Sequence, residues 1–180
     1  FPSLWLSVNF LAETGKVAFP ILSDLSSQGC FIDGYWGDDA CIDENGVNIE
    51  AKIISKIRND TGWKGLYFGG TAFKKQRIIP KEKYGDAAKY ATQFMDVVTT
   101  SGVATGIEAD ISKIKTFRSC IGDSVLAIAS GITVDNAKMY SIADCFMVAT
   151  GINYENDFYE IDHKKLSKLL LVCRQIGMGE

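Results

Sequence analysis

The sequence predicts an α/β fold in which six short strands, each followed by a helix, build a parallel sheet. Runs rich in Val, Ile, Phe and Tyr recur at spacings of roughly 20 to 35 residues, which is the length of one β/α unit. The segments between them carry apolar residues three and four positions apart, as an amphipathic helix does. Most of the runs are apolar throughout rather than alternating, which is typical of strands covered on both faces.

The elements are expected in a regular order along a single domain that spans residues 1–180. Strands are predicted at residues 4–10, 30–36, 65–70, 96–100, 125–130 and 145–150. Helical spacing is found at four sets of apolar positions: Ile49, Ile53, Ile54 and Ile57; Ala87, Ala88, Ala91 and Phe94; Ile111, Ile114 and Phe117; and Leu166, Leu169, Leu170 and Cys173. Asp162 is well placed to cap the last helix.

A barrel accounts for the strand ends better than an open sheet does. The GxGxxG turn of dinucleotide-binding sheets and the GxxxxGK[ST] loop are both missing from the sequence. Instead, a polar or glycine-rich cluster follows almost every strand: Asn9, residues 37–39, residues 69–71, residues 99–102, Ser130-Gly131 and Thr150-Gly151. A (β/α)8 barrel keeps its active site at this end of its strands. The predicted fold is therefore a (β/α)8, or TIM, barrel.

The last two strand ends set the numbering of the strands. Barrels that bind phosphate commonly do so after strands 7 and 8, where glycines let backbone N–H groups approach the anion. The strands that end in Ser130-Gly131 and Thr150-Gly151 are interpreted as these two, so the chain holds strands 3–8. Six strands cannot close an eight-stranded barrel, and two β/α units of about 50 to 60 residues are expected ahead of Phe1. The domain is thus expected to be incomplete at its N-terminus.

Glycines and hydroxyl groups at these two strand ends form the predicted phosphate site. Gly131 and Gly151 would let phosphate oxygens approach the backbone, and the side chains of Ser130, Thr133 and Thr150 would donate hydrogen bonds to the same anion. The alternative is that tight strand-to-helix turns require glycine whether or not a ligand binds.

Two carboxylates and a lysine are the candidate catalytic residues. Asp38 and Asp39 follow the second strand of the sequence, and paired carboxylates can act as general acid and base because their repulsion raises one pKa. They could instead hold a divalent cation with Asp43 or Glu44, or be ordinary exposed loop residues. Lys74, after the third strand, could form an ion pair or a Schiff base with a phosphosugar, or belong to a solvated basic loop.

Other residues near strand ends are candidate substrate contacts. Asn9, Thr100, Ser101 and Thr105 could hydrogen-bond polar groups of a sugar, although ordinary loop capping explains them as well. Trp36 could stack on a base or a sugar ring, or be present for its large buried area. His163, the single histidine, is expected at the surface near a helix cap, so a Ser/His/Asp triad has no support.

Charge and composition narrow the range of partners. The net charge of −3 and the pI of 5.3, with Lys and Arg spread along the chain, give no basic surface for nucleic acid. No apolar run approaches the roughly 20 residues of a transmembrane helix. Five cysteines, odd in number and without CxxC spacing, argue against disulfides or structural zinc and favour a reducing cytoplasm. The expected partner is a small phosphorylated metabolite, and a homo-oligomer is compatible with the sequence.

Several segments, taken in order, resemble a known family. LSVNFL (6–11), DGYWGDDA (33–40), GGTAFK (69–74), DVVTTSG (96–102), SGIT (130–133) and AD (143–144) resemble the BtpA/SgcQ family over most of the chain. The resemblance implies a TIM barrel whose phosphate end is similar to that of phosphoribosylanthranilate isomerase. Some family members are linked to photosystem I biogenesis and others to sugar utilisation. The chain departs from the family pattern at Asp38-Asp39-Ala40, where Asp-Asn-Ala is expected, and at Ala149-Thr150-Gly151 after the last strand.

Three functions follow from these features. The first is an enzyme that acts on a phosphorylated sugar or nucleotide-derived metabolite by acid–base chemistry, of the isomerase, epimerase or lyase type. The alternative, implied by the resemblance, is a non-catalytic assembly or regulatory factor of the photosystem I biogenesis type, since a fold does not fix a function. A third hypothesis is a nucleoside or sugar hydrolase that uses a carboxylate-bound metal.

Overall fold

The computed structural model describes residues 3–178, which form six strands, five α-helices and three 3-10 turns. The strands are β1 (Ser7–Val8), β2 (Gly34–Gly37), β3 (Leu66–Gly70), β4 (Val97–Thr100), β5 (Val125–Ile128) and β6 (Cys145–Phe146). The helices are α1 (Gly15–Ser27), α2 (Ile49–Thr61), α3 (Tyr84–Ala91), α4 (Ile111–Cys120) and α5 (His163–Gln175). The 3-10 turns are η1 (Lys81–Lys83), η2 (Ala137–Tyr140) and η3 (Thr150–Ile152).

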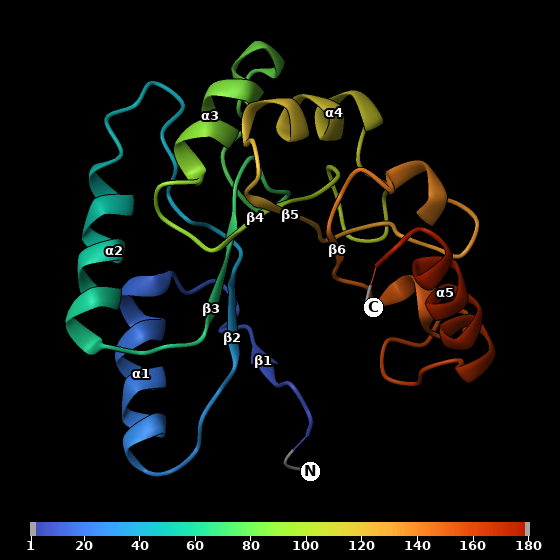
Figure 1. Cartoon of the computed structure of the whole chain (residues 1–180), viewed down its shortest axis with the longest axis horizontal. Coiled ribbons are helices and arrows are strands. Elements are labelled where there is room, and N and C mark those ends of the chain that lie inside the picture. The colour runs from blue at the N-terminus through green and yellow to red at the C-terminus, as the bar shows by residue number, and fades with distance from the viewer. Residues whose placement is uncertain (1–2, 179–180) are drawn as a thin grey trace.

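All six strands form one parallel sheet in which each strand pairs with the next along the chain. Gly34 of β2, for example, lies opposite both Ser7 of β1 and Leu66 of β3. The sheet is curled (Figure 1), but no pairing within residues 3–178 joins β6 back to β1. The predicted α/β class and parallel sheet are confirmed, and the architecture is a half-barrel rather than a closed barrel.

The main core lies between the sheet and the helices, which cover its convex face (Figure 1). Tyr35 of β2 and Tyr67 of β3 stack with their ring centroids 5.5 Å apart, and Phe19 of α1 meets both rings edge-on. All three side chains are buried. Burial of one such side chain stabilises a fold by about 1.5 to 3 kcal/mol, so this aromatic group anchors α1 to the sheet.

A second, smaller apolar cluster lies on the other face of the sheet. It consists of Phe68, Val97 and Ala127, with Trp36, Cys145 and Met147 packed against them. Phe68 is the strand neighbour of Tyr67, and successive side chains of a strand point to opposite faces. Both faces of the sheet therefore carry apolar residues, which explains why the strand sequences are apolar throughout.

The six predicted strand positions each contain a strand, but the two end strands are shorter than expected. β1 covers two of residues 4–10, and β6 covers two of residues 145–150. The prediction that the sixth strand continues to Thr150 is wrong. The backbone leaves the extended conformation at Ala149, with φ −132° and ψ −83°, and the chain enters η3.

The four helices predicted from spacing are confirmed as α2, α3, α4 and α5, and the Asp162 carboxylate caps α5. Sequence spacing assigns no helix to residues 15–27, where α1 begins after the N-cap Thr14 and contains Pro20. Proline is normally excluded from helix interiors because it removes an N–H donor, which obscures this helix in the sequence. The strict strand–helix alternation is wrong between β5 and β6, where the described chain forms only η2.

Candidate functional site

One cavity of about 510 Å³ lies at the carboxyl ends of the strands. It collects residues from the end of every strand in the sheet, as the active sites of (β/α) barrels do. Its lining includes Asn9 after β1, Trp36 and Asp38 at β2, Lys74 and Lys75 after β3, Thr105 and Gly106 after β4, Ser130 and Gly131 after β5, and Thr150 and Gly151 after β6. The structure thus brings together most of the residues predicted for the site.

The two predicted glycines line this cavity, but the packing of the protein already requires them. Gly131 has a φ of +68°, and a Cβ atom there would overlap the backbone of Glu108. A Cβ atom on Gly151 would overlap the carbonyl oxygen of Ile132. Close backbone approach therefore explains both glycines without a ligand, and the phosphate hypothesis has to rest on the cavity that they share.

Of the three hydroxyl side chains predicted to bind the anion, two line the cavity and one does not. Ser130 and Thr150 line the cavity, and Ser130 Oγ also accepts the Gly102 N–H at 2.7 Å. Thr133 is outside the lining of the cavity, and its N–H donates to Asn136 Oδ1 at 2.9 Å. Two of the three predicted hydroxyls remain candidates for ligand contact.

Thr100 and Ser101 lie behind the rim, contrary to their predicted contact with a substrate. Both residues are fully buried and neither lines the cavity. Ser101 Oγ accepts the Lys74 N–H at 2.9 Å and donates to the Gly102 carbonyl, so its side chain joins the loops after β3 and β4. Thr105, the third hydroxyl residue predicted at this strand end, lines the cavity together with Gly106.

Asp38 is the buried carboxylate of the cavity. Its side chain is 8% exposed, and its Oδ1 accepts a hydrogen bond from Asn9 Nδ2 at 3.2 Å. Its Oδ2 lies 3.3 Å from Lys75 Nζ, which allows an ion pair, but it accepts no hydrogen bond from the described residues. Asn9 Oδ1 and Trp36 Nε1 are likewise buried without a partner in residues 3–178. An unsatisfied buried polar atom costs about 1 to 3 kcal/mol, and Trp63 Nε1, Tyr67 Oη and Thr100 Oγ1 are unpaired in the same way outside the lining of this cavity.

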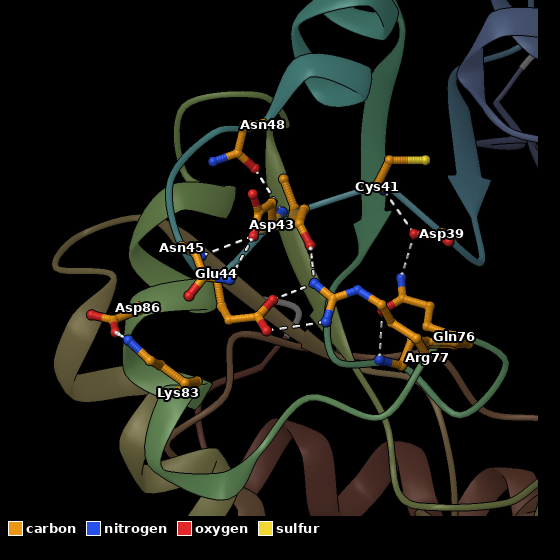
Figure 2. Close-up of polar contacts among 12 residues, drawn as sticks. Asp39, Cys41, Asp43, Glu44, Asn45, Asn48, Gln76, Arg77, Lys83 and Asp86 are labelled. Carbon is orange, nitrogen blue, oxygen red and sulfur yellow. Dashed lines mark hydrogen bonds and ion pairs between the residues drawn. The ribbon is translucent and has the colours of Figure 1, made fainter.

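Asp39 faces away from this cavity, which corrects the prediction of an acid–base pair. Its carboxylate accepts hydrogen bonds from Cys41 N at 2.7 Å and Gln76 Nε2 at 2.9 Å (Figure 2). It lines a separate cavity of about 530 Å³ together with Arg77. Burial raises the pKa of Asp39, and the hydrogen bond from Cys41 opposes that rise. The two adjacent aspartates therefore serve different sites, and Asp38 alone belongs to the first.

Gln76, which the sequence analysis missed, holds the backbone at Asp38. Its Nε2 lies 3.1 Å from the Asp38 carbonyl oxygen and 2.6 Å from the Gly70 carbonyl oxygen, in addition to its contact with Asp39. Its Oε1 accepts the Phe73 N–H at 3.0 Å. In the sequence, Gln76 lies within Lys-Lys-Gln-Arg, a segment typical of a solvated basic loop. A signal for it appears only once the loops after β2 and β3 are seen side by side.

The acidic residues proposed as cation ligands do not gather around Asp38. Glu44 forms an ion pair with Arg77, whose hydrogen bonds lower the pKa of the glutamate (Figure 2). Asp43 accepts hydrogen bonds from Asn45 and lines the second cavity. Among residues 3–178 no group of three or more His, Cys, Asp or Glu side chains is arranged to hold a metal ion.

Lys74 lines the first cavity together with Asp38. Its Nζ donates to the Ala129 carbonyl at 3.2 Å and lies 5.3 Å from the ring centroid of Phe73. Burial lowers the pKa of Lys74, and the charge of Asp38 opposes the change. Lys74 and Asp38 thus line the same cavity, although the lysine that forms the ion pair with Asp38 is Lys75.

No protein-family model matches the chain, and no curated protein matches it. The resemblance to the BtpA/SgcQ family, and every function that it implies, stays a prediction. No helix in residues 3–178 is long and apolar enough to cross a membrane.

Proposed function

We propose that the first cavity binds a small phosphorylated metabolite, of the phosphosugar class, and that Asp38 and Lys74 catalyse an acid–base reaction on it. The observation that carries the proposal is the buried Asp38 carboxylate, with one oxygen free of hydrogen bonds, in a cavity that also contains two lysines and two glycine turns. A cavity of several hundred cubic ångströms suits a ligand of this size.

The charges of the cavity support an anionic ligand. Lys74 and Lys75 both line it, whereas Asp38 is the acidic residue of its lining. Gly131 and Gly151 line the cavity at the far strand ends, where a phosphate group would be received in the proposal. We therefore propose that the phosphate binds near β5 and β6 and that the rest of the ligand lies on the β1–β2 side.

The unpaired polar atoms favour a hydroxyl-bearing ligand. Asn9 Oδ1 and Asp38 Oδ2 are acceptors, and Trp36 Nε1 is a donor. A sugar hydroxyl both donates and accepts, so neighbouring hydroxyls could satisfy atoms of both kinds. The Lys75 side chain is 53% exposed, and its displacement from Asp38 would make room for such a group.

The proposed chemistry is a proton transfer next to a carbonyl or hydroxyl group, of the isomerase, epimerase or lyase type. Asp38 would remove the proton as general base. The Lys74 ammonium would stabilise the negative charge that develops on the substrate oxygen.

We also propose that the six strands correspond to strands 3–8 of a (β/α)8 barrel, which is supported by their consecutive order, the curl of the sheet and the cavity at their carboxyl ends.

Titration with inorganic phosphate and with ribose 5-phosphate, followed by amide NMR, tests the proposal. Both ligands should shift the amide signals of Gly131 and Gly151. Asp38→Asn should weaken ribose 5-phosphate binding relative to phosphate binding, because the variant loses an acceptor for the sugar hydroxyls, whereas the loss of a negative charge favours both anions alike. Asp39→Asn is the matched control and should change neither. Shifts that map to the cavity around Arg77, or no shift at millimolar ligand, would refute the proposed site.

A further inference from the structure

A lysine of α4 is buried beneath two of the loops that form the site. Lys113 is 7% exposed, although lysine is among the residues least often buried without a partner. Its Nζ donates to the carbonyl oxygens of Ala72, at 2.5 Å, and Ser101, at 2.8 Å. The ammonium group also lies 5.1 Å from the ring centroid of Tyr84 and 5.8 Å from that of Phe117. Two directed hydrogen bonds and two aromatic faces thus fix its position.

The two carbonyl groups belong to neighbouring loops at the cavity. Ala72 lies in the loop after β3, which also carries Lys74, and Ser101 directly follows β4. Ser101 Oγ accepts the Lys74 N–H at 2.9 Å, so the contacts of Lys113 reach the backbone of Lys74 through a single residue. The N–H of the residue after Ser101 donates to Ser130 Oγ at 2.7 Å, which continues the chain of contacts to the end of β5.

Burial of a charged group is costly at this position. Burial lowers the pKa of Lys113 to about 8, and the nearby Asp110 carboxylate opposes this effect only in part. A methionine has a similar length and would fill the same space without the loss of hydration. What lysine adds is the pair of hydrogen bonds to the two loops.

We propose that Lys113 is a positioning residue that holds Lys74 at the cavity by tying the loops after β3 and β4 together. The inference deepens the proposed function and rests on it, because in that function Lys74 stabilises the negative charge of the ligand. Lys113 itself faces a different cavity, of about 530 Å³, whose other titratable residues are Lys81, Tyr84, Glu108, Asp110 and Tyr140. It acts on the ligand only through the loops.

Amide hydrogen exchange tests the tie without any ligand. The Lys74 N–H should be protected in the wild-type protein, and Lys113→Met should raise its exchange rate by at least about tenfold relative to the amides of β2. Lys115→Met replaces an exposed lysine of the same helix and should leave the rate unchanged. An unprotected Lys74 amide in the wild-type protein would overturn the inference even if Lys113→Met failed to fold. Equal rates in the variant and the wild type would overturn it as well.

Binding of inorganic phosphate separates a positioning role from a purely structural one. Lys113→Met should weaken phosphate binding roughly tenfold in the wild-type background and have no further effect when Lys74 is already methionine. A loss of stability, by contrast, should be the same in both backgrounds. Equal weakening of phosphate binding in both backgrounds would overturn the inference. If wild-type protein binds no phosphate, the proposed function fails, and hydrogen exchange still decides whether Lys113 holds the Lys74 loop.

Discussion

Replacing Lys113 by methionine should change how the stability of the fold depends on pH. Burial lowers the pKa of this lysine from 10.5 to about 8. Between these two values the unfolded chain binds a proton that the folded chain does not, so the free energy of unfolding rises with pH across this window. The full change is about 3 kcal/mol, because each pKa unit corresponds to about 1.4 kcal/mol. The cost of burying the charge is therefore present at neutral pH and disappears above pH 10.5.

Urea unfolding at pH 7.5, 9 and 10.5 measures this effect as a difference between the wild type and Lys113→Met. The wild-type curve alone is insufficient, since burial raises the pKa of Cys41 to about 11 and also raises that of Tyr35, and both groups lower stability as the pH increases. These contributions cancel in the difference, which should move by about 3 kcal/mol in favour of the wild type. Lys115→Met should show no such movement. A difference that stays constant to within about 0.5 kcal/mol would refute the reasoning.

Two further substitutions test the rim of the sheet. Gly131→Ala should lower the free energy of unfolding by about 3 kcal/mol, because of its positive φ and the overlap of a Cβ atom with Glu108; Gly29→Ala, at φ +82° with nothing within 4 Å, should cost about 1 kcal/mol. Equal costs in denaturant melts would show that backbone conformation alone requires the glycine. Arg77→Met should return the pKa of Glu44 toward its ordinary value of 4.5, as a carboxyl NMR titration would show. Because the folded pKa is lowered, the pair stabilises the protein near neutral pH and loses this effect in acid; an unchanged pKa would contradict that.

Regular features of the fold could be predicted because they depend on local pattern. The strands and four helices follow from apolar spacing, and the address of the site follows from polar residues at strand ends. The helix α1 could not be found in this way, because Pro20 contradicts its local signal and the stabilisation comes from burial of Phe19 against the sheet. Packing against the sheet therefore stabilises α1, and local spacing does not reveal such packing.

Which of the predicted residues reach the cavity could not be determined from the sequence, for a similar reason. Asp38 and Asp39 are adjacent in the bend that follows β2, but each contacts a different part of the fold. Asp39 accepts a hydrogen bond from Gln76. Ser101 accepts hydrogen bonds from Lys74 and Lys113. Residue type identified which side chains could do chemistry, and long-range contacts determined which of them reach the cavity.

The open half-barrel also bears on how copies of the chain behave in concentrated solution. A free sheet edge offers unpaired N–H and C=O groups to a strand from another molecule, which is a common route to aggregation. Within residues 3–178 the two edges are β1 and β6, each with only two residues in the sheet. An incoming strand would gain few backbone hydrogen bonds at either edge. The shortness of these strands therefore limits edge-to-edge association, although the longer strands between them have a strongly apolar sequence.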